Sequence, residues 1–200
     1  MKKLLLAAAL AVIALTATVG SASAASFRTE ASNITSISEG KVTFSAAGFI
    51  NIACRITLTG RIRAGLFNKV AGTQFGEITA VAVNECERGT VTQILIEAER
   101  VFPITYQSIE GALPEAVTLI AFNITRTGFR LRETGGTECL YAGDVFASTR
   151  VTGRNPYTTT GNIAIIGDNI GGGTGFCAFL NGTMTGEFRP LEPAIRITRL

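Results

Sequence analysis

The stretch from Phe49 to Ile62, FINIACRITLTGRI, decides the fold class of this chain. Apolar residues occupy every second position, and polar or charged residues fill most positions between them. One face carries Ile50, Ile52, Cys54, Ile56, Leu58 and Ile62. The opposite face carries Asn51, Arg55, Thr57, Thr59 and Arg61. Because side chains alternate between the two faces of a strand, the stretch predicts one half-buried strand, or two strands that bend at Gly60.

The β pattern continues along the rest of the chain, and no window shows a sustained helical period. Further strands are predicted over residues 76–86, 90–98, 117–126, 139–142, 144–151, 162–166, 176–188 and 194–198. Turn signals between them include Glu39-Gly40, Gly135-Gly136 and Asn155-Pro156. About ten short antiparallel strands joined by Gly-rich turns predict an all-β fold, a β-sandwich, with a closed β-barrel as the alternative.

The strand that begins near Val117 changes its alternation within the predicted sheet. Apolar residues continue as Phe129 and Leu131 on the opposite parity, after an interruption at Gly128. An extra residue in one strand shifts the parity by one, so we expect a β-bulge or a corner at Gly128.

The N-terminal segment has the pattern of a secretory signal peptide. Lys2 and Lys3 precede an uncharged apolar run over residues 4–19, and Ala22-Ser23-Ala24 fits a cleavage site. The run is shorter than the roughly 20 residues that a bilayer span needs, which disfavours an uncleaved anchor. We therefore expect cleavage near Ala24, a mature chain that begins at Ala25 or Ser26, and a single domain over residues 25–200.

The chain contains four cysteines, and in an exported protein these predict two disulfides. The favoured pairing is Cys54–Cys86 and Cys139–Cys177, because each bridge then closes a loop within its own half of the chain. The two other pairings, and four free buried thiols, are the alternatives. C-x-x-C pairs, the usual zinc signature, are absent.

Composition excludes several classes of function. The chain has no His and no Trp, which removes the commonest general base and zinc ligand, so we expect no metal, no cofactor and no Ser-His or Cys-His nucleophile. The formal net charge of +3 includes Lys2 and Lys3, and the nearly neutral mature chain gives no electrostatic reason to bind nucleic acid or anionic membranes. An outer-membrane barrel is disfavoured because aromatic girdles are missing, so no membrane insertion of the mature chain is expected.

The candidate sites each favour a plain structural interpretation. The Gly-rich stretch Gly167–Gly175 lacks the Lys and the Ser or Thr of a phosphate loop, and Asp168 alone cannot form a calcium loop, so a flexible hairpin or loop is expected. Two carboxylate pairs, Glu85 with Glu87 and Glu97 with Glu99, are interpreted as surface charge rather than as glycosidase acids. Lys41 and Lys69 are likewise interpreted as surface residues.

Several spaced motifs resemble a group of uncharacterised secreted proteins of actinobacteria. They are Cys54-x-x-x-Leu58-x-Gly60-x-Ile62, Gly76-Glu77-Ile78-Thr79 with Cys86, Ile104-x-Tyr106-x-Ser108-Ile109-x-Gly111-x-Leu113-Pro114, and Cys139-Leu140-Tyr141-x-Gly143. The resemblance covers most of the mature chain. It implies secretion and an all-β fold, and it carries no activity.

The sequence therefore predicts a secreted or cell-surface β-domain without enzymatic activity, serving in binding, adhesion or envelope structure, with a protein or cell-surface ligand as a possible partner. The alternative is a secreted hydrolase that acts through carboxylates, which requires a pocket holding two or more acidic residues. A third hypothesis, a ligand-carrying or inhibitor-like barrel, requires a cavity lined by Phe and Ile.

Overall fold

The computed structural model describes residues 26–46, 50–93, 101–110, 119–152, 157–170, 182–191 and 195–199. Within these ranges the secondary structure consists of strands, which confirms the predicted all-β class. The strands are β1 Ser26–Thr29, β2 Ser32–Ser38, β3 Val42–Ala46, β4 Ile50–Ile62, β5 Gly65–Asn68, β6 Gln74–Glu87, β7 Gly89–Gln93, β8 Phe102–Glu110, β9 Leu119–Glu133, β10 Glu138–Thr152, β11 Tyr157–Ile170, β12 Gly182–Leu191 and β13 Arg196–Arg199.

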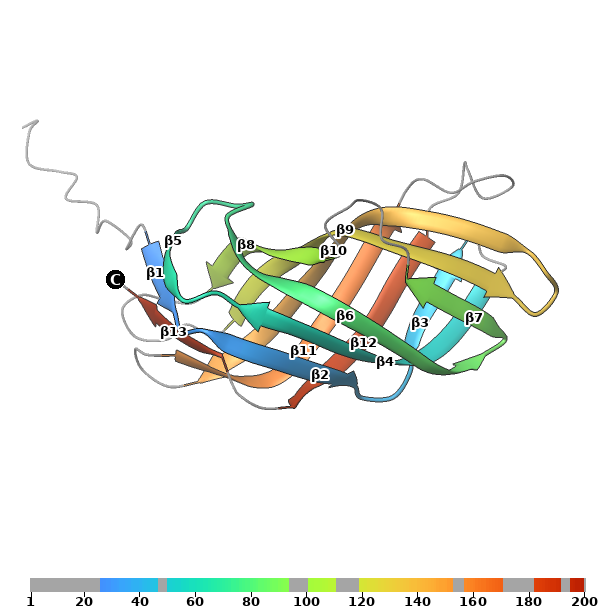
Figure 1. Ribbon diagram of the computed structural model, residues 1–200, viewed down its shortest axis with the longest axis horizontal. Helices are drawn as coiled ribbons and strands as arrows, with labels where there is room; N and C mark the ends of the chain where they lie inside the picture. Colours follow the sequence, from blue (N-terminus) through green and yellow to red (C-terminus); the bar gives the residue numbers. More distant parts are fainter. Residues whose placement is uncertain are drawn as a thin grey trace, which may run out of the picture.

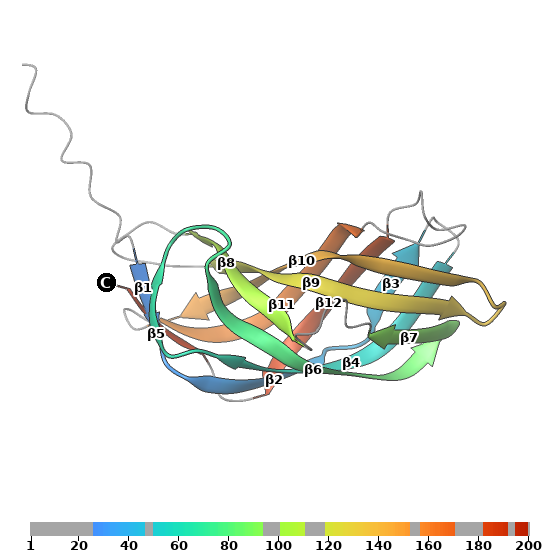
Figure 2. The ribbon, with the colours of Figure 1, turned by 45° about the horizontal axis from the view of Figure 1, so that its top comes forward.

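The strands pair antiparallel and form two layers around one core (Figures 1 and 2). Hydrogen-bonded neighbours follow the order β2-β12-β3-β4-β6-β8-β9-β10-β11-β13-β1-β5, with further pairings of β2 with β4 and of β12 with β11. In both views β4 and β6 cross in front of β11 and β12. Strand β12 bonds β11 on one side and β2 and β3 on the other, so the layers of this sandwich are joined by strand pairing.

Strand β4 confirms the alternation from which the fold class was predicted. Ile50, Ile52 and Ile56 are at most 1% exposed, and the strand runs without interruption to Ile62. Gly60 is therefore not a bend. A Cβ atom at this position would lie 2.4 Å from the carbonyl oxygen of Glu77 and 3.2 Å from Cα of Ile78. Glycine is required here because β6 approaches the backbone of β4 closely, next to a register shift in their pairing.

Replacing Gly60 by alanine is expected to lower the free energy of unfolding by about 1–3 kcal/mol, because the added methyl group forces the two backbones apart. Gly135→Ala is the matched control, since its Cβ would meet only a side-chain oxygen at 3.9 Å. We expect the control to change stability by less than about 0.5 kcal/mol. Urea unfolding of both variants measures the difference, and equal midpoints would refute the close-approach explanation.

The parity change in β9 is confirmed, but it lies two residues before the predicted Gly128. Val145 pairs with Ile124 and Gly143 pairs with Thr127. Two residues of β9, Thr125 and Arg126, therefore lie opposite a single residue of β10, Asp144. The bulged Arg126 has a φ of 58°, and its amide donates a hydrogen bond of 3.1 Å to Oδ1 of Asp144. The carboxylate thus satisfies the amide that the bulge removes from the strand ladder.

Several strand bounds differ from the sequence prediction. The two short strands predicted over residues 139–142 and 144–151 form one continuous strand, β10. The predicted ranges also left out five strands: β1, β2, β3, β5 and β8. In β8 the reason is that Phe102 to Tyr106 are buried on both faces and show no alternation. Of the stretches predicted as strands, residues 49, 94–98, 117–118, 176–181 and 194 lie outside the described residues.

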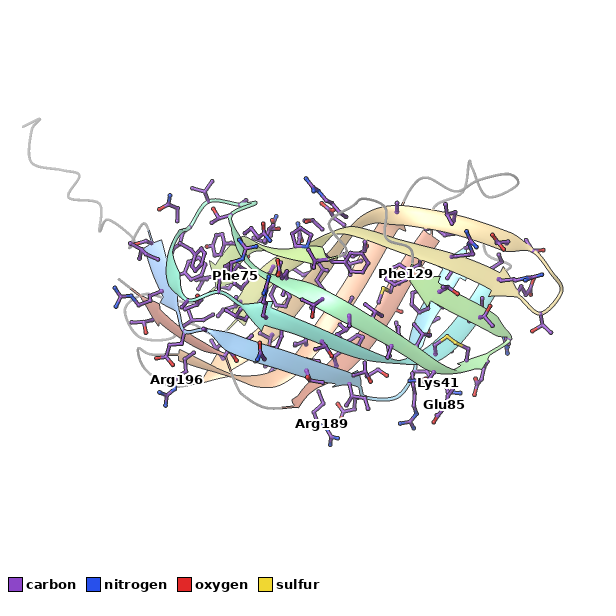
Figure 3. The ribbon with its side chains drawn as sticks, viewed as in Figure 1. Lys41, Phe75, Glu85, Phe129, Arg189 and Arg196 are labelled. Carbon is purple, nitrogen blue, oxygen red and sulfur yellow. A yellow bond between two sulfur atoms is a disulfide. The ribbon has the colours of Figure 1, made fainter. Side chains whose placement is uncertain are left out.

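The core runs along the length of the molecule between the layers. At the end that carries β1 and β5, Phe27 packs against Phe67, Phe75 and Tyr106. Towards the other end Phe44 contacts Phe129 at 5.3 Å between ring centroids. Figure 3 shows Phe75 and Phe129 at these two separate positions.

Candidate functional site

The first of the predicted site features is a disulfide between Cys54 of β4 and Cys86 of β6. Its Cα atoms are 4.1 Å apart, and the pair Cys54–Cys86 confirms the favoured connectivity for this half of the chain. Ala53 pairs with Glu87 and Arg55 with Asn84, so β6 carries one extra residue beside the bridge. That bulge places Glu85 at a φ of 48° and sets Cys86 opposite the fully buried Cys54.

The second predicted disulfide involves Cys139 of β10. Cys139 is 0% exposed and is disulfide-bonded. Its predicted partner, Cys177, lies outside the described residues. The pairing Cys139–Cys177 therefore stays a prediction, whereas free thiols are ruled out at Cys54, Cys86 and Cys139.

The carboxylates that flank Cys86 lie on the outer surface of β6. The side chains of Glu85 and Glu87 are 65% and 64% exposed and form ion pairs with Arg55 and Lys41. The hydrogen bond from Lys41 lowers the pKa of Glu87 below its ordinary value. Figure 3 shows Lys41 and Glu85 projecting away from the layers. Their geometry is that of solvated surface charge, as the sequence predicts.

The other candidate residues are only partly described. Glu97 and Glu99 lie outside the described residues. Of the predicted loop Gly167–Gly175, residues 167–170 belong instead to β11, where Gly167 pairs with Met184 and Ile170 with Gly182, and residues 171–175 lie outside the described residues. Because β11 and β12 are consecutive antiparallel strands, these four residues form one arm of a hairpin, which agrees with the hairpin form of the prediction and not with its loop form.

Glu77 is a buried carboxylate that was not among the predicted site residues. Its side chain is 4% exposed, lies on β6, and forms ion pairs with Arg61 and with Arg63, the latter at 3.1 Å. Burial raises the pKa of Glu77, but hydrogen bonds from Arg63 and Arg61 outweigh it, and the net effect is a pKa below the ordinary value of 4.5. In the sequence, the only indication of this ion-paired site is that Arg61 and Arg63 lie on the same face of a strand. Their partner, Glu77, is identified only by the pairing of β4 with β6, which places Glu77 opposite Arg61.

The lowered pKa of Glu77 predicts a loss of stability in acid. A carboxyl group whose pKa is lower in the folded than in the unfolded protein stabilises the native state when the pH is above its unfolded pKa. This stabilisation is lost as the pH falls from about 4.5 to below the pKa of the folded state. Glu77→Gln should cost about 1–2 kcal/mol at pH 7 and flatten the acid limb of the stability curve. Glu85→Gln, at an exposed ion pair, is the control that should leave that limb unchanged. Urea midpoints between pH 3 and pH 7 test this, and an acid limb shared by wild type and Glu77→Gln would contradict it.

Two kinds of feature are absent from the described part of the chain, a metal-binding cluster and a membrane-spanning helix. There, no cluster of three or more His, Cys, Asp or Glu residues is arranged to hold a metal ion. In the same residues, no helix has the length and apolar character needed to span a membrane.

Two apolar cavities and one polar pocket are formed by described residues. The larger of the two apolar cavities, about 50 Å³ against about 210 Å³ for the polar pocket, lies between the layers and is lined by ten isoleucines together with Phe75 and Phe122. A second cavity of about 20 Å³ adjoins it. The polar pocket, at the end of β2, holds Arg55, Arg189 and a single carboxylate, Glu39. None of these three spaces holds the two acidic residues that the hydrolase hypothesis requires, whereas the larger cavity has the Phe and Ile lining of the ligand-carrier hypothesis.

Fold and site together define an all-β structure that is cross-linked by a disulfide and contains an apolar cavity. No family model, curated protein or solved structure matches the chain. The resemblance to secreted actinobacterial proteins therefore stays an expectation.

Proposed function

We propose that this protein is an exported, non-enzymatic β-domain that works by binding or as a structural element of the cell surface. The observation that carries the proposal is the Cys54–Cys86 disulfide between neighbouring strands. Structural disulfides persist in oxidising compartments and are rare in the cytosol, so the bridge supports export.

The N-terminal sequence supports the same proposal independently. The charged start, the apolar run and the small residues that end at Ala24 and Ala25 have the order of a secretory signal. Strand β1 begins at Ser26, so cleavage near Ala24 leaves every described strand intact.

The distribution of carboxylates favours binding over hydrolysis. A glycosidase needs two carboxyl groups about 5–9 Å apart across a cleft, and its acid has a raised pKa. Glu77 is instead held ionised by two arginines, and Glu85 and Glu87 are exposed in ion pairs. The absence of His from the chain also removes the usual base of a nucleophilic hydrolase.

The non-enzymatic part of the proposal is tested by turnover assays on the purified, oxidised protein. Chromogenic glycosides, esters and peptides are the substrates, and we expect no turnover above the buffer rate. Turnover that disappears in Glu77→Gln or in Glu85→Gln would overturn the proposal in favour of the carboxylate hydrolase, and turnover insensitive to both would overturn it as well.

A further inference from the structure

The outer face of β10 and β11 carries two large apolar side chains side by side. Phe146 is 40% exposed and Ile166 is 45% exposed, and the two residues are paired directly across the strands. Their neighbours Val145, Ala147 and Ile165 are at most 1% exposed, so alternation turns Phe146 and Ile166 away from the core. Single apolar residues are common on a protein surface, whereas an adjacent pair forms a patch that a binding partner can bury.

A partner cannot cover this patch by adding a strand, because β10 and β11 are interior strands. Strand β10 is hydrogen-bonded to β9 and β11, and β11 is hydrogen-bonded to β10 and β12. The backbone groups at these positions are therefore used within the sheet. A partner must pack its side chains onto the outer face, as the second sheet of a β-sandwich does.

Side-chain size differs between neighbouring rows of this outer face. One row runs across four strands through the large pair and contains Thr43, Thr185, Ile166 and Phe146. The next row, two residues along each strand, contains Glu187, Ala164 and Ser148. The two large side chains thus lie beside two small ones on the same strands. Two copies of this face complement each other when one copy is turned end over end, because large side chains then meet small ones.

Charge follows the same symmetry along β10. The outward positions of this strand are, in chain order, Asp144, Phe146, Ser148 and Arg150. An exposed carboxylate and an exposed guanidinium therefore lie equally far on either side of Ala147. When two copies face each other across a two-fold axis that crosses β10 at Ala147, each Asp144 lies opposite Arg150 of the second copy, and each Phe146 lies opposite Ser148.

We propose that the outer face of β10, β11, β12 and β3 is a self-association surface, on which a second copy of this chain packs face to face in a symmetric dimer. The dimer buries the apolar pair of each copy and forms two ion pairs between Asp144 and Arg150. The formal net charge of +3 gives little long-range repulsion between copies. The inference goes beyond the proposed function and depends neither on export nor on the lack of turnover.

The size of the face predicts a weak dimer. Strand spacing and rise per residue give it a projected area of roughly 400 Å² between Asp144 and Arg150. One partner in an interface of standard size buries roughly 800 Å². We therefore expect a reversible dimer with a dissociation constant of roughly 100 µM.

The first test follows backbone amide shifts of the oxidised, ¹⁵N-labelled protein in a dilution series from about 2 mM to about 20 µM. We expect concentration-dependent shifts at Phe146, Ser148 and Ile166. Phe146→Ser should weaken the dimer at least ten-fold, because two buried rings are lost. Leu66→Ser, at a side chain that is 59% exposed on β5, is the matched control and should leave the dissociation constant unchanged.

A second test uses the charges. Asp144→Asn removes the charge but keeps the side-chain oxygen that accepts the hydrogen bond from the amide of Arg126. Asp144→Asn and Arg150→Gln should each weaken the dimer about five-fold, and the double variant no further, since the two residues form the same ion pairs. Arg28→Gln, at an exposed position of β1, is the control and should have no effect.

Three results would overturn the proposal. They are a monomer throughout the dilution series, a dimer that Phe146→Ser leaves unchanged, and charge effects that add in the double variant. The charge variants keep the proposal testable if Phe146→Ser does not fold.

Discussion

Replacing Cys54 and Cys86 together by alanine is expected to lower the free energy of unfolding by about 3.5–4 kcal/mol. The bridge joins positions 32 apart in sequence, so its loss restores the freedom of a long loop to the unfolded chain. A domain of this size loses roughly 2–4 °C of melting temperature per kcal/mol, which predicts a fall of roughly 7–16 °C. The strands themselves should remain, because the surrounding residues of β4 and β6 stay paired.

Thermal unfolding followed by far-UV circular dichroism measures both effects. Asn51→Ala, at an exposed position of the same strand, is the control and should melt with the wild type. A double variant that melts at the wild-type temperature would show that the bridge contributes nothing to stability, and a variant without β signal would show that the fold depends on it entirely.

Phe27→Ala is expected to be equally damaging, at about 3–5 kcal/mol. Phe27 is 2% exposed, and its ring lies 5.4 Å from Tyr106 and 5.8 Å from Phe75. Strand β1 is four residues long, so this one ring provides much of the packing that holds it to β6 and β8. Its removal leaves a cavity that the neighbouring rings fill only in part.

The control for Phe27→Ala is Leu66→Ala on the neighbouring β5, where the side chain is 59% exposed. We expect that substitution to change the free energy of unfolding by less than about 0.5 kcal/mol. Urea unfolding compares the two variants. A cost for Phe27→Ala no larger than that for Leu66→Ala would mean that the aromatic cluster does not anchor β1.

The parts of the fold that depend on local alternation could be predicted from the sequence. Strand β4 and the buried position of Cys54 follow from a period of two, and the pairing with Cys86 follows from closing a loop within the same half of the chain. Strand β8 was not predicted, because Phe102–Tyr106 are buried on both faces of the strand. An alternating pattern arises only when one face of a strand is buried and the other is exposed, and this part of β8 has no exposed face.

The candidate site and the exact positions of the bulges depended on contacts between strands, which local patterns do not contain. The bulge at Arg126 shifts the apolar alternation of its strand, which placed it two residues away at Gly128, whereas the bulge at Glu85 was not predicted; both residues adopt positive φ angles without being glycine. Glu77 becomes a buried ion-paired carboxylate only when β4 brings Arg61 beside it. The apolar cavity arises from the separation of the layers, and isoleucines that line it have the same pattern as isoleucines that fill the core.

The intact mass of the exported protein, measured without reduction, tests the central claim most directly, because export and cross-linking are read from one number. The account predicts a chain that begins at Ala25 or Ser26 and is two hydrogen masses lighter for each of the two predicted disulfides. A chain that still carries Lys2 and Lys3, or one with free thiols at Cys54 and Cys86, would contradict it.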